Sequence, residues 1–210
     1  MDSVTDVVNK LDTDGYAVSG VLFSGQEIAQ LVQALPSVAS SGTRTLLQRP
    51  VFRRLAALLR TETALAVCLT DLVAVEGIFF QKSLGRNWSV KPHRDSVIPI
   101  SGDGPWRSAG SKEGMACVHA PLAFMRRCVA VRLALDPVPD GDIRVEPGTH
   151  RGSAGSPPVT LVVPQGGALL LRPSLRHSSA KLVHSEQRRV VHLLFAPRDL
   201  PASYRWYHEA

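Results

Sequence analysis

Apolar residues at helical spacing mark the first part of the chain. A first helix is predicted by apolar residues three or four positions apart, which are Val4, Val7, Val8 and Leu11. Turn residues at 12–15 end it, and an extended segment is predicted over 16–22. Ser24 and Glu27 form a capping box that begins a second helix, and a third is predicted after Pro50. We expect these helices to pack on a larger unit and to carry no chemistry of their own.

From about residue 65, the pattern changes to short β-type runs separated by glycine and proline. The predicted strands are 72–82, 97–100, 129–135, 142–145, 159–163, 168–172 and 189–195. Many short strands between turns favour a sandwich or barrel over a parallel α/β sheet. No repeat or linker interrupts the pattern, so residues 1–210 are predicted to form a single domain. In it, 1–60 are mostly helical and 65–200 form a β-rich core.

The composition is that of a globular protein with an apolar core. Apolar residues make up 44% of the 210 residues, and charged residues make up 20%. The formal charge of +6 comes mainly from arginines scattered along the chain, while aromatic residues are only 6%. A nucleic-acid-binding protein usually gathers its arginines into blocks between aromatic residues. Codon usage in a GC-rich genome, or an anionic small-molecule substrate, therefore explains the charge better than nucleic acid does.

Signals for export and for membrane insertion are not found in the sequence. No apolar run reaches the roughly 18 residues of a membrane span. Residues 1–3 do not begin a basic or apolar leader. Cys68, Cys117 and Cys128 are odd in number and lack metal-type pairing, as expected for reduced, mostly buried thiols. We expect a cytoplasmic protein with no membrane partner, and the sequence leaves its oligomeric state open.

A His-x-Asp pair is the first candidate for metal chemistry. His93 and Asp95 lie two residues apart in a segment that reads as extended, so both side chains point to the same side. Pro92 restricts the backbone just before the histidine. The pair is weak evidence alone, because His-x-Asp is frequent by chance.

A distant histidine and an arginine make the pattern more specific. His177 ends an apolar strand that a glycine turn opens at 166–167. Two imidazoles and one carboxylate are the ligand set that iron(II) uses when it must keep positions open for dioxygen. Arg188 follows His177 by eleven residues, at the head of the last predicted strand. Its guanidinium can hold the distal carboxylate of a dicarboxylic acid through two hydrogen bonds.

With these motifs the chain resembles the phytanoyl-CoA dioxygenase-like family of iron(II)/2-oxoglutarate-dependent oxygenases. The matching stretches are NWSVKPHRD at 87–95, PGTHR at 147–151, LRPSLRHSS at 171–179 and RRVVHLLFA at 188–196. With looser similarity elsewhere, the resemblance covers nearly the whole chain. It implies a mainly β fold, a double-stranded β-helix (jelly roll, cupin-like) core with the N-terminal helices packed on it. It also implies a reaction in which 2-oxoglutarate is decarboxylated to succinate while a C–H bond is oxidised.

The resemblance assigns roles to particular residues. His93, Asp95 and His177 would bind Fe(II), and Arg188 would bind the 2-oxoglutarate carboxylate. Ser179 resembles the hydroxyl contact of the family to this co-substrate. The strand 78–82 would line the same pocket, with Ile78 and Lys82 as its candidate contacts; a solvated Lys82 is the alternative.

Three further residues are candidates for the substrate pocket. Trp106 could stack over a bound molecule or anchor a loop. Arg132 could meet an anionic substrate or be a paired structural arginine. His192 shares a strand face with Arg188 and could approach the pocket or be a core histidine with satisfied hydrogen bonds. Segments 101–120 and 152–158 are expected to be the loops that shape this pocket.

The sequence therefore predicts a dioxygen-using hydroxylase of a small molecule. One alternative is a cupin-type metal enzyme that does not use 2-oxoglutarate, against which Arg188 argues. The other is a catalytically inactive binding module of the same fold, against which the intact ligand set argues. A nucleic-acid substrate is disfavoured by the scattered arginines. The chain is short for the family, so the segments that cover the substrate must be small or come from a partner subunit.

Overall fold

The largest sheet is built from strands whose apolar residues alternate between two faces. The computed structural model describes residues 4–38, 41–137, 143–152, 156–183 and 186–210. The strand order is β1-β11-β8-β13-β3-β2, and every pair is antiparallel. Their bounds are β1 Tyr16–Val21, β11 Gly167–Leu171, β8 Val129–Ala134, β13 Gln187–Pro197, β3 Leu72–Ser83 and β2 Gly42–Thr43. We call this the central sheet.

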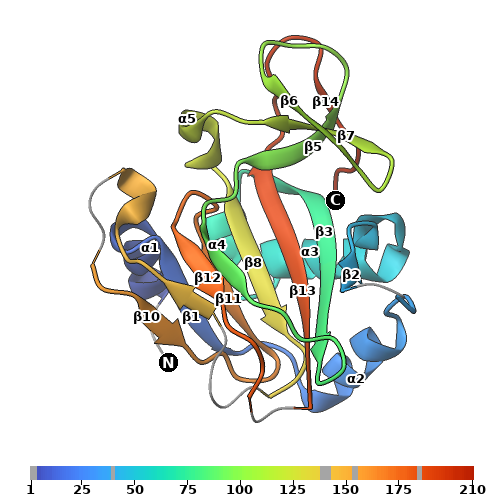
Figure 1. Ribbon diagram of the computed structural model, residues 1–210, viewed down its shortest axis with the longest axis vertical. Helices are drawn as coiled ribbons and strands as arrows, with labels where there is room; N and C mark the ends of the chain where they lie inside the picture. The colour runs from blue at the N-terminus through green and yellow to red at the C-terminus, as the bar shows by residue number, and fades with distance from the viewer. Residues whose placement is uncertain (1–3, 39–40, 138–142, 153–155, 184–185) are drawn as a thin grey trace.

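The N-terminal helices cover one face of the central sheet (Figure 1). They are α1 Val4–Thr13, α2 Gly25–Gln33, the 3-10 helix η1 Leu46–Gln48, α3 Pro50–Thr61 and α4 Ala66–Leu69. Val131 and Leu133 of β8 share a buried core with Leu55 and Leu59 of α3. Because side chains alternate along a strand, Arg132 between them faces the opposite side of the sheet. The predicted helices are confirmed, including the capping box of α2.

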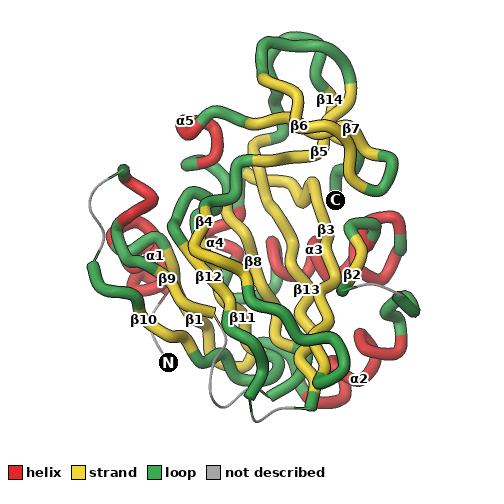
Figure 2. The backbone as a smooth tube through the Cα atoms, in the orientation of Figure 1, coloured by secondary structure: helices red, strands yellow, loops and turns green. Residues whose placement is uncertain are grey.

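A smaller sheet packs on the face of the central sheet that the helices leave open (Figure 2). Its order is β10-β9-β12-β4, with bounds β10 Val159–Leu161, β9 Ile143–Val145, β12 His177–Ser179 and β4 Val90–His93. Val145 and Leu161 of this sheet share a second buried core with Leu169 and Leu171 of β11. Two antiparallel sheets face to face, with helices outside, confirm the predicted jelly-roll fold.

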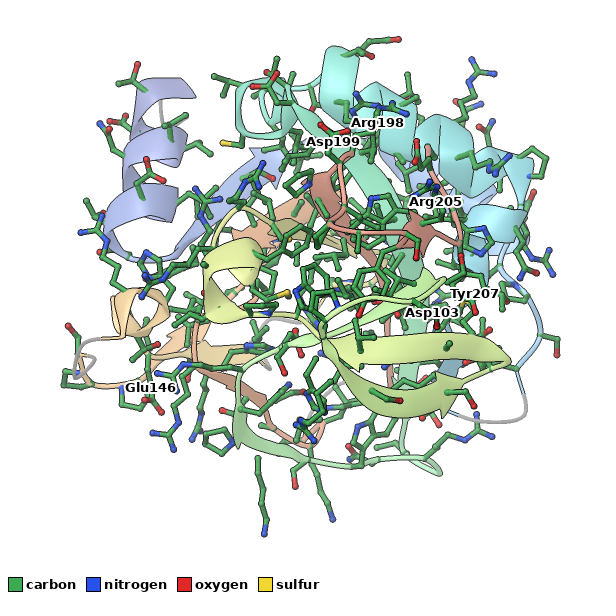
Figure 3. The ribbon with its side chains drawn as sticks, turned by 90° about the horizontal axis from the view of Figure 1, so that it is seen from above. Asp103, Glu146, Arg198, Asp199, Arg205 and Tyr207 are labelled. Atoms are coloured by element: carbon green, nitrogen blue, oxygen red, sulfur yellow. The ribbon has the colours of Figure 1, made fainter. Side chains whose placement is uncertain are left out.

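A third sheet, β14-β5-β7-β6, stands over one end of the sandwich (Figure 1). Its strands are β5 Val97–Ser101, β6 Arg107–Lys112, β7 Met115–His119 and β14 Arg205–Trp206, and the short helix α5 Leu122–Met125 follows β7. The expectation of a loop over 101–120 was therefore wrong, because the mostly exposed strand β6 lacks the apolar alternation that marks a strand. Asp103 and Tyr207 lie on this side of the molecule, opposite Glu146 (Figure 3). The backbone N–H of Ala116 donates to Tyr207 Oη at 3.0 Å, which ties the C-terminal segment to the hairpin.

The predicted strands are confirmed with small shifts of their ends. The largest extension is in β13, which begins at Gln187 and therefore includes Arg188 within the strand. Residue 142 of one predicted strand and residues 153–155 of one expected loop lie outside the described residues. Cys117 and Cys128 are buried free thiols, and Cys68 is a partly exposed one. Across the described ranges, no helix is long and apolar enough to cross a membrane.

Candidate metal centre

Neighbouring strands of the smaller sheet bring two histidines together. β4 and β12 run antiparallel with His93 directly opposite His177. Directly opposed residues of an antiparallel pair point to the same face, and the two ring centroids are 4.3 Å apart. His177 is buried, whereas the His93 side chain is 39% exposed. One ring is therefore enclosed by the sandwich, and the other lies at its opening.

Asp95 completes the group just after the end of β4. Its backbone N–H donates to Pro173 O at 2.9 Å, which fixes the chain where the carboxylate leaves it. Asp95 Oδ1 lies 3.4 Å from His93 Nε2, and Oδ2 lies 3.6 Å from His177 Nε2. Ligands that are each about 2 Å from one ion stand roughly 3 Å from one another. Of the described residues, these three form a group whose ligand atoms all lie within 4.8 Å.

The hydrogen bonds behind the histidines set their tautomers. His93 Nδ1 lies 2.9 Å from Lys91 O, and His177 Nδ1 lies 2.9 Å from Leu175 O. A carbonyl oxygen can only accept, so each Nδ1 carries the hydrogen and donates it. In the neutral imidazole this leaves the lone pair on Nε2, the atom that faces Asp95. The donor set therefore fits a divalent ion such as iron(II).

The electrostatics of the group favour a charged carboxylate and a neutral buried imidazole. Desolvation alone would raise the pKa of Asp95, but the hydrogen bond with His93 and the interaction with His177 hold that pKa well below its ordinary value. Burial lowers the pKa of His177, which favours its neutral, metal-binding form. The hydrogen bond to Asp95 raises the pKa of His93, so a proton and a metal ion compete for that nitrogen.

The facing wall, on the central sheet, carries buried cations at one end. Arg188 of β13 lies opposite Lys82 of β3 in the strand register, and both side chains are buried. Lys82 Nζ donates to Ser179 Oγ at 2.5 Å, a contact that joins the two sheets, and lies 5.3 Å from the centre of the Trp88 ring. Burial and the charge of Arg188 lower the pKa of Lys82 to about 7. Burial and the charge of Arg132 lower the pKa of Arg188 to about 9.

Arg189 points the other way. Its guanidinium forms an ion pair with Asp136 at 2.5 Å, and its backbone N–H donates to the same carboxylate at 2.7 Å. It is not a lining residue of the cavity, whereas Arg188 is one. The two neighbouring arginines therefore have different surroundings on opposite faces of β13, because side chains alternate along a strand.

A cross-strand row spans the middle of the same wall. Ile78, His192 and Arg132 lie opposite one another on β3, β13 and β8, and all three line the cavity. His192 packs edge-on against Phe80, with ring centroids 6.0 Å apart, and its Nδ1 has no hydrogen-bond partner among the described residues. Burial, with the charge of Arg132, lowers the pKa of His192 to about 3, so this imidazole is neutral at pH 7. Arg132 itself lies 6.0 Å over the Phe80 ring.

The cavity between the two sheets has a volume of about 390 Å³. It is lined by the three candidate ligands, by the cationic end at Lys82 and by Glu76 further along β3. Six residues of extended chain separate Lys82 from Glu76, or roughly 20 Å. This length accommodates two small molecules end to end in the cavity that the three candidate ligands also line.

The residues at the Glu76 end belong to none of the motifs found in the sequence. Glu76, Arg44 and Lys112 line the cavity there, and Trp88 lines it near Lys82. Glu76 shares the even-numbered face of β3 with Ile78, so strand alternation could have identified it. No sequence signal places Arg44 here, because it lies in the connection between β2 and η1, outside the N-terminal helices.

Trp106 is the predicted pocket residue that the structure places elsewhere. Its ring packs against Phe124 and Tyr204, with centroids 4.9 and 5.3 Å apart, and it is not a lining residue of the cavity. Its backbone N–H donates to Tyr204 Oη at 2.8 Å. Trp106 is therefore a loop anchor, because its partners come from α5 and the C-terminal segment, whose positions strand alternation does not predict.

Solved structures resemble this one over nearly the whole chain. SnoK, a non-haem alpha-ketoglutarate-dependent carbocyclase from nogalamycin biosynthesis, matches with a TM-score of 0.70 and 15% identity, over 95% of this chain and 85% of that one. HygX from Streptomyces hygroscopicus, with nickel and 2-oxoglutarate bound, gives 0.65 and 18%, over 91% and 86%. SnoN, an epimerase of nogalamycin biosynthesis that is also alpha-ketoglutarate dependent, gives 0.65 and 18%, over 95% and 90%.

The chain shares their fold. At identities of 15% and 18%, the likeness concerns the fold alone. No protein-family model matches the sequence, and no curated protein matches it either. The activity therefore has to be argued from the site.

Proposed function

We propose that this protein is an iron(II)- and 2-oxoglutarate-dependent oxygenase that acts on a small molecule. The proposal rests mainly on three preorganised candidate ligands whose side chains converge in one cavity. His93 and His177 each present an Nε2 lone pair toward Asp95 because each Nδ1 donates to a backbone carbonyl. The similarity of fold to enzymes described as alpha-ketoglutarate dependent supports the same conclusion.

Arg188 and Lys82 are proposed to bind the distal carboxylate of 2-oxoglutarate. Both are buried, they are adjacent in the register of β13 and β3, and they lie in the same cavity as the metal group. A charge-assisted hydrogen bond in such a site is stronger than a neutral one. Ser179, which accepts a hydrogen bond from Lys82, is placed to contact the same carboxylate. Ile78 forms an apolar side of this binding site.

The proposed reaction oxidises one C–H bond at the expense of the co-substrate. Bound iron(II) supplies the activation of dioxygen. In a hydroxylation, one oxygen atom enters the substrate as a hydroxyl group and the other enters succinate, and CO2 leaves. His93, Asp95 and His177 would hold the metal, and a set of three protein ligands would leave room for the reactants to bind it. His192, neutral and buried, offers a hydrogen-bonding nitrogen at the middle of the cavity without adding charge.

Hydroxylation is the outcome we propose, and the sequence resemblance to the phytanoyl-CoA dioxygenase-like family supports it. Two proteins of the same fold are described as a carbocyclase and an epimerase, so ring closure or epimerisation is the second candidate outcome. Mass spectrometry decides between them, because hydroxylation adds one oxygen atom to the substrate, ring closure removes two hydrogens and epimerisation leaves the mass unchanged.

The cationic character of the cavity does not require an anionic substrate. An anionic substrate was predicted from Arg132, which shares the cavity with Asp95. Burial lowers the pKa of Arg132, and the negative charge of Asp95 partly offsets that lowering. Arg188 and Lys82 face the proposed dicarboxylate co-substrate. An anionic substrate would have to contact a cation other than these three.

Succinate formation tests the proposal directly. The purified protein with Fe(II), 2-oxoglutarate and dioxygen should release succinate, and a true substrate should accelerate the release. A protein that binds the metal and consumes dioxygen without forming succinate would be the cupin-type alternative. A protein that binds the metal but turns over no candidate substrate or co-substrate would be the inactive binding module.

A further inference from the structure

Glu76 is a buried carboxylate at the end of the cavity away from Arg188. It lies on the same face of β3 as Ile78 and is only 5% exposed. The pairing of β3 with β13 shifts register between Ala74 and Glu76, and such bulges commonly re-aim side chains beside functional sites. A charged carboxylate buried here without a partner would destabilise the folded protein, because burial disfavours the charged form.

Arg44 is that partner, and the ion pair leaves other polar atoms of both side chains able to form hydrogen bonds. Arg44 Nη1 donates to Glu76 Oε1 at 2.6 Å, and both residues line the cavity. In the described part of the chain, Glu76 receives no other side-chain hydrogen bond, and the guanidinium of Arg44 donates through Nη1 alone. The pair therefore presents an acceptor oxygen and several N–H donors side by side at the cavity wall.

The position of Arg44 is held from two sides. The adjacent Thr45 bridges to Gly77 of β3, where an added Cβ would come within 3.0 Å of Leu47. From the other side, the Arg44 backbone N–H donates to the carboxylate of Glu113, at the tip of the β6–β7 hairpin, at 3.0 Å. Three separate parts of the chain therefore hold the Glu76–Arg44 pair in place: the segment at 44–45, strand β3 and the β6–β7 hairpin. Such support is more than an incidental surface ion pair would have.

Charge at this end of the cavity favours a neutral ligand. The charges of Arg44 and Glu76 compensate each other at 2.6 Å. Glu76 would repel an anionic ligand, because its carboxylate lies at the cavity wall beside the Arg44 guanidinium. Lys112 also reaches this end, but it is partly exposed, and solvent screens its charge. A cationic ligand would compete with Arg44, which is already bound.

We propose that Glu76 and Arg44 form the substrate-recognition subsite and that they bind a hydroxyl group of a neutral, polyhydroxylated substrate such as a sugar ring. A hydroxyl can donate to Glu76 and accept from Arg44 at once, which matches what the pair offers. Ile78, in the row that spans the middle of the wall, is two residues from Glu76, or about 7 Å along the strand. A hydroxyl held there would keep the ring in the cavity that the three candidate metal ligands also line. This inference rests on the proposed function, which assigns the other end of the cavity to 2-oxoglutarate.

Three probes with the same ring and different charge test the proposal. The protein is first loaded with Fe(II) and 2-oxoglutarate without dioxygen, and the coloured chelate is recorded by its visible charge-transfer band. It is then titrated with methyl α-D-glucopyranoside, D-glucuronate and D-glucosamine. We expect the neutral glucoside to bind most tightly. We expect Glu76→Gln and Arg44→Lys each to weaken it roughly tenfold, the effect of losing one charge-assisted hydrogen bond. Glu209→Gln is the control, because Glu209 pairs with Arg198 outside the cavity.

The possible failures are distinguishable. Tighter binding of glucuronate, weakened by Arg44→Lys, would make this an anion site and overturn the proposal, as would tighter binding of glucosamine weakened by Glu76→Gln. A loaded protein that shows the coloured chelate but binds none of the probes would overturn the subsite and leave the proposed function standing. Absence of the chelate itself would overturn both. The comparison of probes on the unmodified protein stands even if one variant does not fold.

Discussion

His93 and His177 are held by the same local contact, a hydrogen bond from Nδ1 to the carbonyl two residues earlier in the chain. The carbonyl acceptors are backbone atoms, so the tautomer is set by strand geometry and not by a further side chain. Each Nε2 is therefore prepared to accept a metal ion before one binds, which lowers the cost of ordering the ligands. Substitutions at single residues of the site are therefore expected to have different effects from substitutions at their neighbours.

Replacing His177 by alanine should remove tight metal binding. The substitution deletes one of the three proposed ligands and the buried lone pair that faces Asp95, so we expect the affinity for Fe(II) to fall at least about 100-fold. His208→Gln is the matched control, because His208 is not part of the ligand group. A metal titration by calorimetry measures both. Wild-type affinity in His177→Ala would show that this histidine is not a ligand.

Arg188→Ala should raise the KM for 2-oxoglutarate by about 10- to 100-fold, because a charge-assisted bond to a desolvated carboxylate is lost. Arg188→Lys should recover only part of this, since the guanidinium fork is lost. Arg189→Ala should leave KM unchanged but lower the melting temperature, because it strands the buried Asp136. Steady-state kinetics and thermal melts separate the two arginines. A large KM effect at Arg189 with none at Arg188 would contradict the assignment.

At the scale of elements, the site depends on which strands are neighbours. β12 lies between β9 and β4, so His177 at the start of β12 lies directly opposite His93 at the end of β4. The β6–β7 hairpin is held over the cavity end by its tip, where the Glu113 carboxylate accepts from Arg44 N–H and from Thr43 Oγ1 at 2.6 Å. Glu113 has a φ of 49°, a left-handed backbone conformation that residues other than glycine seldom adopt.

Glu113→Ala should loosen this hairpin without unfolding the sandwich. The substitution removes the hydrogen bonds at an exposed tip, so we expect a loss of about 1 kcal/mol at most in the free energy of unfolding. Amide hydrogen exchange should become faster at Arg44 and in β7 while the central sheet stays protected. Ser111→Ala, an exposed position on the same hairpin, serves as the control. Unchanged exchange at Arg44 would show that Glu113 does not hold the tip.

At the scale of the whole molecule, the proposed ligands connect the two sheets of the sandwich. The metal group belongs to the smaller sheet and its adjoining segment, while Arg188 belongs to the central sheet. A dicarboxylate bound to both would act as a bridge, in addition to the Lys82–Ser179 contact that already joins the sheets. Ligands that bind only the folded state stabilise it by an amount that grows with the logarithm of the ratio of ligand concentration to Kd.

Nickel(II) and 2-oxoglutarate together should therefore raise the melting temperature by more than the sum of their separate effects. In the proposed site, the metal would form part of the binding site of the co-substrate, and each ligand would therefore strengthen the binding of the other. In Arg188→Ala the excess should largely disappear while the effect of nickel alone remains, because the metal ligands are intact. Thermal melts in the four ligand conditions measure this coupling. Strict additivity in the unmodified protein would show that the two ligands do not share a site.

The sequence by itself determined the features that depend on local spacing. Helical periodicity and a capping box located the first helices, and alternation located most strands of the two main sheets. The spacing of His93 and Asp95 on an extended segment implied a shared side. The same alternation placed Arg188 and Arg189 on opposite faces of β13, as the Asp136 contact confirms. These features are set by the geometry of a few consecutive residues, which a single sequence displays directly.

Only the tertiary structure decided what lies across the cavity. Three contacts join segments that are far apart in the chain: the pairing of β4 with β12, the Glu76–Arg44 ion pair, and the packing of Trp106 against Tyr204 outside the cavity. The β6–β7 hairpin was missed because its polar, exposed strand has no apolar face to bury, and its order comes from contacts at Glu113 and Tyr207. Such contacts depend on how sheets pack, and hydrophobic pattern along one segment carries no information about its neighbour in space.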